Sequence, residues 1–330
     1  MMEGRVKFIL PACLLVVTVH AAAVTAVNKK PIIGILTQDM SEGMMEALAG
    51  LGYKWYIASS YVKYFESGGA RVVPILVEQD EVYYRKIVSS VNGIVFPGGG
   101  SSIRSGPYAD AGRTLYNLVL EKAEQGNEIA MIGICLGFQM LMYLAAVSNP
   151  LTSCNAKDVA DPLFFKPGLE NSQIFGEAPD TIIKTLAQSN STSNFHAYCV
   201  TETKFMEKNV NESFKIISTS FDKDGVEYIS TVEHKTLPIY GLQWHPEKNL
   251  FEWVYGSIPH TMEAVGAAQY VVNVFVEKAR QNNQKFSDVN EEAEMLIYNY
   301  DSIYIRRLII SSFMECYFFK DEKEGDSYAP

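Results

Sequence analysis

The chain has 330 residues, of which 48% are hydrophobic and 20% are charged, a composition typical of a globular protein rather than a disordered or fibrous one. Its 38 acidic residues outnumber its 28 Lys and Arg residues, which gives a formal net charge of -10. Such a chain lacks the basic field that gathers phosphates, so we expect no nucleic-acid partner.

The N-terminal segment differs in kind from the rest of the chain. Arg5 and Lys7 precede an apolar run over Phe8–Val19, and three alanines follow. This order is typical of a secretory signal peptide, so we predict a signal peptide over residues 1–24 and a mature domain over residues 25–330. The alternative is an N-terminal anchor helix, but the run is shorter than the roughly 20 apolar residues that span a bilayer. We therefore expect no membrane association of the mature chain.

The first half of the mature chain alternates strand and helix patterns. Strands are predicted over Pro31–Leu36, Ala70–Leu76, Gly93–Phe96 and Glu128–Ile134. Helices are predicted over Ile57–Ser67, Val82–Val91, Ala109–Gln125 and Leu136–Val147. This alternation predicts an α/β fold in which a parallel sheet carries helices on both faces.

The second half is less regular. Strands are predicted over Phe214–Ser220, Val226–Glu233 and Pro238–Trp244, and a long amphipathic helix over Met262–Gln281. Residues 282–294 are polar, and we expect them to form an exposed link to a C-terminal segment that packs back on the rest. One domain is the favoured organisation.

Sequons and cysteines fit the secretory route. The sequons begin at Asn190 and Asn211, and we predict glycans at both. Four cysteines follow the signal peptide: Cys135, Cys154, Cys199 and Cys316. They are too few for a disulfide scaffold, and their spacing does not suggest zinc, so we expect no metal and no cofactor. Pairing among the last three stays open.

Cys135 is the candidate nucleophile. It lies between Gly133 and Gly137 where a predicted strand runs into a predicted helix. The Gly-x-nucleophile-x-Gly pattern permits a sharp turn that lifts the side chain above the sheet, and the helix N-terminus favours the thiolate. The alternative is a small buried cysteine with a packing role only.

His245 is the candidate base. It ends a predicted strand, and catalytic groups collect at such ends in parallel sheets. Pro246 stiffens the turn, and Glu247 can reach one imidazole nitrogen and stabilise the cation. A lone histidine is more often structural, but the cysteine elbow and the His-Pro-Glu sequence together are far more specific than either alone.

Gly98, Gly99 and Gly100, here called the triglycine loop, follow the strand that ends at Phe96. Three glycines let backbone N–H groups turn outward, which suits an oxyanion hole or a phosphate cradle. No Gly-Lys-Ser/Thr sequence follows, so a phosphate loop is excluded. A plain flexible loop is the alternative.

These motifs resemble the class I glutamine amidotransferase-like superfamily. Within it, the chain resembles the gamma-glutamyl hydrolase, or folylpolyglutamate hydrolase, family over segments 31–36, 56–64, 69–74, 194–196 and 243–248. The resemblance implies a flavodoxin-like three-layer α/β/α sandwich with a mainly parallel sheet. It also implies a lysosomal or secreted cysteine hydrolase, an omega peptidase that cleaves γ-glutamyl bonds of folate and antifolate polyglutamates through a thioester.

The resemblance further implies residue roles. Cys135 would be the nucleophile, His245 the acid/base and Glu247 its orienting partner. The oxyanion hole would use backbone N–H groups of Gly99, Gly100 and Leu136. Four side chains are candidates for binding the substrate and its carboxylates: His196, Arg104, Lys63 and Gln139. For the two cations among them, ordinary surface charge is the alternative.

Two other functions stay open. Gln139 also fits the glutaminase pattern Gly-x-Cys-x-Gly-x-Gln, so the chain could hydrolyse glutamine to supply ammonia to a synthetase, although the predicted signal peptide disfavours a cytosolic partner. A catalytically inactive binding or storage protein on the same fold is the second rival, and the complete Cys, His and Glu set speaks against it. We also expect a homodimer.

Overall fold

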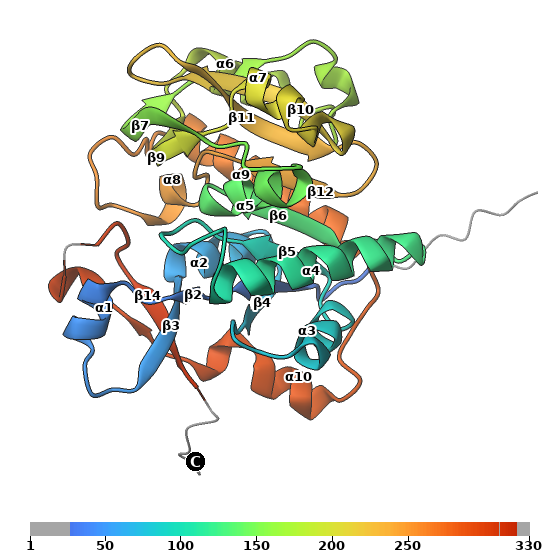
Figure 1. Ribbon diagram of the computed structural model, residues 1–330, viewed down its shortest axis with the longest axis vertical. Helices are drawn as coiled ribbons and strands as arrows, with labels where there is room; N and C mark the ends of the chain where they lie inside the picture. Colours follow the sequence, from blue (N-terminus) through green and yellow to red (C-terminus); the bar gives the residue numbers. More distant parts are fainter. Residues whose placement is uncertain (1–26, 310, 322–330) are drawn as a thin grey trace, which may run out of the picture.

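The computed structural model describes residues 27–309 and 311–321, so the predicted signal peptide lies outside the described residues (Figure 1). Its centre is an eight-stranded sheet of order β4-β1-β5-β6-β12-β11-β10-β8. These strands are β4 (Arg71–Ile75), β1 (Ile32–Leu36), β5 (Gly93–Phe96), β6 (Ala130–Ile134), β12 (Ile239–Leu242), β11 (Glu227–His234), β10 (Phe214–Phe221) and β8 (Phe164–Phe165). The five strands from β4 to β12 run parallel to one another. Each of the last three, β11, β10 and β8, runs antiparallel to the strand before it in this order.

Helices cover both faces of the parallel strands. On one face lie α2 (Ser59–Ser67) and α9 (Met262–Arg280), and on the other lie α3 (Glu81–Val88), α4 (Pro107–Glu124) and α5 (Leu136–Ala145) (Figure 1). Every residue of β1, β5 and β6 is therefore buried, which is why these strands read as continuous apolar runs. The predicted α/β/α sandwich with a mainly parallel sheet is confirmed.

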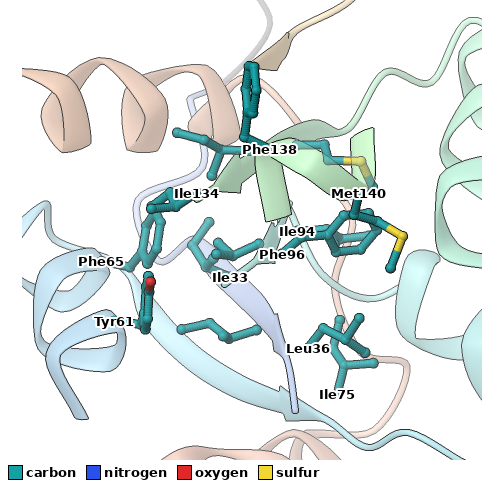
Figure 2. Packing of buried hydrophobic residues seen from close by; sticks show 14 of the residues in the cluster. Ile33, Leu36, Tyr61, Phe65, Ile75, Ile94, Phe96, Ile134, Phe138 and Met140 are labelled. Carbon is teal, nitrogen blue, oxygen red and sulfur yellow. The ribbon is translucent and has the colours of Figure 1, made fainter. Parts of the chain in front are cut away.

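One hydrophobic core joins these layers. Figure 2 shows Tyr61 and Phe65 of α2 near Ile33 of β1, together with Phe138 and Met140 of α5 in the same cluster. Tyr61 is 0% exposed, so its hydroxyl must find a partner inside the protein. That partner lies at the carboxyl ends of the strands.

A second sheet has the order β13-β14-β3-β2, which are Ser302–Ile303, Cys316–Lys320, Tyr53–Ala58 and Gln38–Asp39. The helix predicted from Ile57 begins only at Ser59, because Tyr53–Ala58 pairs antiparallel with β14 instead. The C-terminal segment thus packs back as predicted, with β14 running beside β3 in Figure 1. The predicted exposed link is wrong at its start, because Asn282 is buried and its side chain donates to the Glu128 carbonyl at 2.8 Å.

A third, two-stranded sheet pairs β7 (Thr152–Asp161) with β9 (Thr192–Cys199). A disulfide between Cys154 and Cys199 crosses it, with the Cα atoms 5.9 Å apart, and Cys135 and Cys316 are free thiols. The other helices are α1 (Glu42–Ala47), α6 (Asp180–Gln188), α7 (Glu202–Glu207), α8 (Lys248–Phe251), α10 (Val289–Met295), η1 (Leu169–Asn171), η2 (Val210–Glu212), η3 (Ile297–Asn299) and η4 (Ile305–Arg307). Among the described residues, no helix has the length and apolar character needed to cross a bilayer.

Candidate active site

Cys135 occupies a strained turn between β6 and α5. Its φ of 53° and ψ of -102° lie in a region that residues with a side chain rarely adopt. The turn is held on both sides: the Cys135 N–H donates to the Leu242 carbonyl at 2.7 Å, and the Cys135 carbonyl accepts from the Gln139 N–H at 3.0 Å. Strain that the surrounding structure maintains in this way is a feature of functional sites.

The two glycines of the elbow are required by close approach of backbone to backbone. A Cβ on Gly137 would overlap the carbonyl of Phe96, and a Cβ on Gly133 would overlap the carbonyl of Gly137. Only glycine lets α5 begin this close to β5 and β6. The N-terminus of α5, with its partial positive charge, is thereby fixed beside the Cys135 sulfur.

His245 and Glu247 form a buried pair just beyond the end of β12. The Nδ1 of His245 lies 2.7 Å from Oε1 of Glu247, and the two residues are 3% and 0% exposed. The His245 N–H also donates to the Ser193 carbonyl at 2.9 Å, which fixes the backbone. With Nδ1 donating to the carboxylate, the other ring nitrogen is left for Cys135, which lines the same cavity as His245.

The charges around His245 favour its protonated form. Burial alone would lower the pKa of the imidazole, but the negative charges of Cys135 and Glu247 outweigh burial and raise the pKa to about 9. At neutral and acid pH His245 is therefore an imidazolium, which is the form that pairs with a thiolate and can protonate a leaving group.

Tyr61 joins this pair to the triglycine loop; it lies in segment 56–64, which carries the family resemblance, but no role was predicted for it. Its hydroxyl accepts from the Gly98 N–H at 2.8 Å and lies 3.4 Å from Nδ1 of His245. Burial, followed by the charges of Glu247 and Cys135, raises the pKa of Tyr61 well above its usual range, so the hydroxyl keeps its proton.

The triglycine loop packs directly against the catalytic pair. A Cβ on Gly98 would come within 2.5 Å of the Tyr61 hydroxyl and 2.8 Å of the His245 ring. Gln38 holds the loop from the other side, donating from Nε2 to the Gly98 carbonyl at 2.8 Å. Gln38 follows β1 and Gly98 follows β5, so the loop lies where the order of strands reverses, the usual place for a ligand in an open α/β sheet.

Two adjoining cavities, of about 570 and 440 Å³, open on the thiol. Both are lined by Gly99, Gly100 and Cys135, and Leu136 lines the smaller one. The residues predicted to form the oxyanion hole therefore line the cavities onto which Cys135 opens. Because the thiol stands at their junction, a chain-like substrate can extend to both sides of it.

Each cavity carries a cation, and one of the two was not predicted. Lys248 lines the larger cavity although it is only 1% exposed; its Nζ lies 4.6 Å from the ring centre of Phe313 and donates to the Ser312 carbonyl at 3.1 Å. Arg104 lines the smaller cavity and is exposed. Lys63 lines neither cavity, and its ammonium is paired with Glu315 on the surface.

The other two predicted substrate-binding residues, His196 and Gln139, line the smaller cavity. Gln139 donates from Nε2 to the Tyr198 carbonyl at 3.0 Å. Burial, reinforced by the positive charge of His245, lowers the pKa of His196 to about 3. His196 is therefore neutral at physiological pH and lines the cavity without a charge.

The chain is similar to a known protein family and to several known proteins. A family model described as peptidase C26 covers residues 31–247, a range that includes Cys135, His245 and Glu247. The chain is 40% identical over 293 residues to a gamma-glutamyl hydrolase of Homo sapiens, covering 88% of this chain and 90% of that protein. It is 35% identical over 288 residues to gamma-glutamyl hydrolase B of Dictyostelium discoideum, covering 85% and 81%. Among solved structures, the Trypanosoma brucei CTPS glutaminase domain with bound acivicin has a TM-score of 0.47 at 13% identity, over 78% of this chain and 98% of that chain.

Proposed function

The chain belongs to the peptidase C26 family, and from that premise we propose that it hydrolyses γ-glutamyl bonds with Cys135 as the nucleophile. The observation that carries the proposal is the constellation around one sulfur. A cysteine on a strained elbow faces a buried imidazolium–carboxylate pair, and a glycine loop lies against both. This is the geometry of acyl transfer through a thioester.

The reaction follows from the positions of these groups. The Cys135 thiolate attacks the γ-carbonyl carbon, and backbone N–H groups of Gly99 or Gly100 and of Leu136 stabilise the oxyanion. His245, held by Glu247, gives its proton to the leaving amine. The neutral imidazole then takes a proton from water, which attacks the γ-glutamyl thioester and releases the acid.

Folate and antifolate polyglutamates are the proposed substrates. A poly-γ-glutamate chain carries one α-carboxylate per residue, and each cavity beside Cys135 offers one cation, Lys248 or Arg104. Cationic donors bind carboxylates through charge-assisted hydrogen bonds. His196 and Gln139 line the smaller cavity with uncharged polar side chains.

Product analysis tests the proposal against the glutaminase alternative. The purified chain is incubated with a synthetic pteroyl-penta-γ-glutamate and, separately, with glutamine, and the Cys135→Ala variant is the control. We expect shortened pteroylglutamates, and turnover of glutamine at least about 100-fold slower. Faster turnover of glutamine would favour the glutaminase, and no turnover of either would favour an inactive binding protein.

The cellular form is also part of the proposal. Residues 1–24 are a signal peptide, and residues 25–330 form one hydrolase domain, a homodimer destined for the lysosome and the extracellular space. Glycans are placed on Asn190, which is exposed just before β9, and on Asn211, which is partly buried in η2. N-terminal sequencing, glycosidase treatment and sedimentation of the secreted protein test these points in turn.

A further inference from the structure

Three metal-ligating side chains meet where β7 pairs with β9. Nδ1 of His196 lies 3.6 Å from the sulfur of Cys154 and 3.4 Å from the sulfur of Cys199, and the two sulfurs form the disulfide. These ligand atoms all lie within 4.8 Å of one another. The cysteines are 45 residues apart in the sequence, so their spacing did not suggest a metal site.

The hydrogen bonds around His196 leave Nδ1, the nitrogen that faces the two sulfurs, free of a proton and able to bind a metal ion. The Asn194 amide donates from Nδ2 to the Thr192 carbonyl at 3.0 Å, so its Oδ1 is the atom 3.3 Å from Nε2 of His196. Nε2 therefore carries the proton, and the lone pair of Nδ1 points to the two sulfurs. Metal-binding histidines are oriented by an outer hydrogen bond of this kind.

The distances suit a tetrahedral ion. Zinc binds sulfur at about 2.3 Å and imidazole nitrogen at about 2.0–2.1 Å, which places tetrahedral sulfur and nitrogen ligands about 3.6 Å apart and two sulfurs about 3.8 Å apart. Both sulfur–nitrogen distances already have nearly this value. Only the sulfurs, which a disulfide holds about 2 Å apart, must separate, and rotation about the Cα–Cβ bonds provides such a change.

We propose that the Cys154–Cys199 disulfide, once reduced by a thiol, becomes with His196 a binding site for a thiophilic divalent ion such as Zn²⁺. A reductant thiolate attacks the half-buried Cys154 sulfur and releases the Cys199 thiolate. A second reductant thiol breaks the mixed disulfide, which leaves two cysteine thiols and the oxidised reductant. The ion then binds both sulfurs and Nδ1 of His196, displaces two thiol protons and takes a water molecule as its fourth ligand.

Cobalt binding tests this site directly. The full chain carries Cys135→Ser, so that the catalytic thiol cannot bind metal, and is reduced with dithiothreitol that is then removed without oxygen. We expect one Co²⁺ per reduced chain, with a thiolate-to-cobalt charge-transfer band that Zn²⁺ abolishes by displacement. The unreduced protein should bind Co²⁺ at least about 100-fold more weakly, because its two sulfurs are joined in the disulfide and cannot act as thiolate ligands.

Matched variants decide which residues hold the ion. Cys154→Ser with Cys199→Ser should abolish the band, Cys316→Ser should preserve it, and His196→Ala should weaken binding at least about tenfold. The proposal is overturned if the band persists in the double variant or is as strong before reduction. It is equally overturned if the reduced chain keeps its circular dichroism spectrum but binds no Co²⁺, or if it loses its fold on reduction.

Discussion

Replacing Glu247 with glutamine removes one charge from the catalytic pair while keeping its shape. Together with Cys135, Glu247 raises the pKa of His245 from 6.5 to about 9 against the effect of burial. That difference corresponds to about 3 kcal/mol, at about 1.36 kcal/mol per pH unit. If Glu247 supplies roughly half of it, the pKa of His245 falls by at least about one pH unit in the variant.

The pH profile of kcat/KM on a γ-glutamyl peptide measures this change. The imidazolium that protonates the leaving amine is lost as the pH rises through the His245 pKa, so the alkaline limb should move at least about one pH unit lower in Glu247→Gln. Glu252→Gln is the matched control, because Glu252 is also buried but accepts from the Met314 N–H at 2.8 Å instead of holding His245. An alkaline limb that stays in place in Glu247→Gln would refute the role assigned to this carboxylate.

The same pair should make stability depend on pH. Because the pKa of His245 is raised in the folded chain, its stabilising contribution is fully present below pH 6.5 and is lost as the pH rises through about 9. Chemical denaturation should show a free energy of unfolding that falls over this range, by up to about 3 kcal/mol from this group. The fall should be smaller in Glu247→Gln, and an equal fall in both proteins would contradict the assignment.

Three further substitutions test other parts of the site. Gly98→Ala should lower kcat at least about 100-fold, because its methyl group would come 2.5 Å from the Tyr61 hydroxyl. Gly100→Ala is the control and should lose much less activity, because its methyl group meets open space. Equal losses of kcat in steady-state assays would contradict the packing argument. Tyr61→Phe should lower kcat about tenfold with little change in KM, because the Gly98 N–H loses its acceptor, and an unchanged kcat would remove Tyr61 from the site. Lys248→Met should raise the KM for a poly-γ-glutamate about tenfold, whereas Lys63→Met should leave it unchanged. A KM raised by Lys63→Met and not by Lys248→Met would instead indicate that Lys63 binds the substrate.

Local patterns predicted the frame of this site. β1, β5 and β6 are short apolar runs buried on both faces, and such strands can be predicted from their own sequence without knowledge of the strands they pair with. The elbow at Cys135 and the pair at His245 are equally local, since each places its chemistry within a few residues of a strand end. The sequence was therefore sufficient for these parts.

The parts that were not predicted depend on contacts between distant segments. Tyr53–Ala58 forms a strand because it pairs with β14 near the other end of the chain, so the helix was predicted to begin too early. Tyr61 matters because α2 carries its hydroxyl to Gly98, and its spacing within the helix is that of any core residue. Lys63 and Lys248 illustrate the same limit: both are lysines, and only the fold shows that Glu315 neutralises one while the other lines a cavity.

Trapping the acyl-enzyme tests the central claim most directly. The chain is mixed with a γ-glutamyl peptide, quenched in acid within one turnover, digested and analysed by mass spectrometry. The mechanism predicts a γ-glutamyl group on the peptide that contains Cys135, labile to hydroxylamine as a thioester is, and absent from Cys135→Ala. Turnover by the Cys135→Ala variant, or an acyl group attached to any other residue, would contradict it.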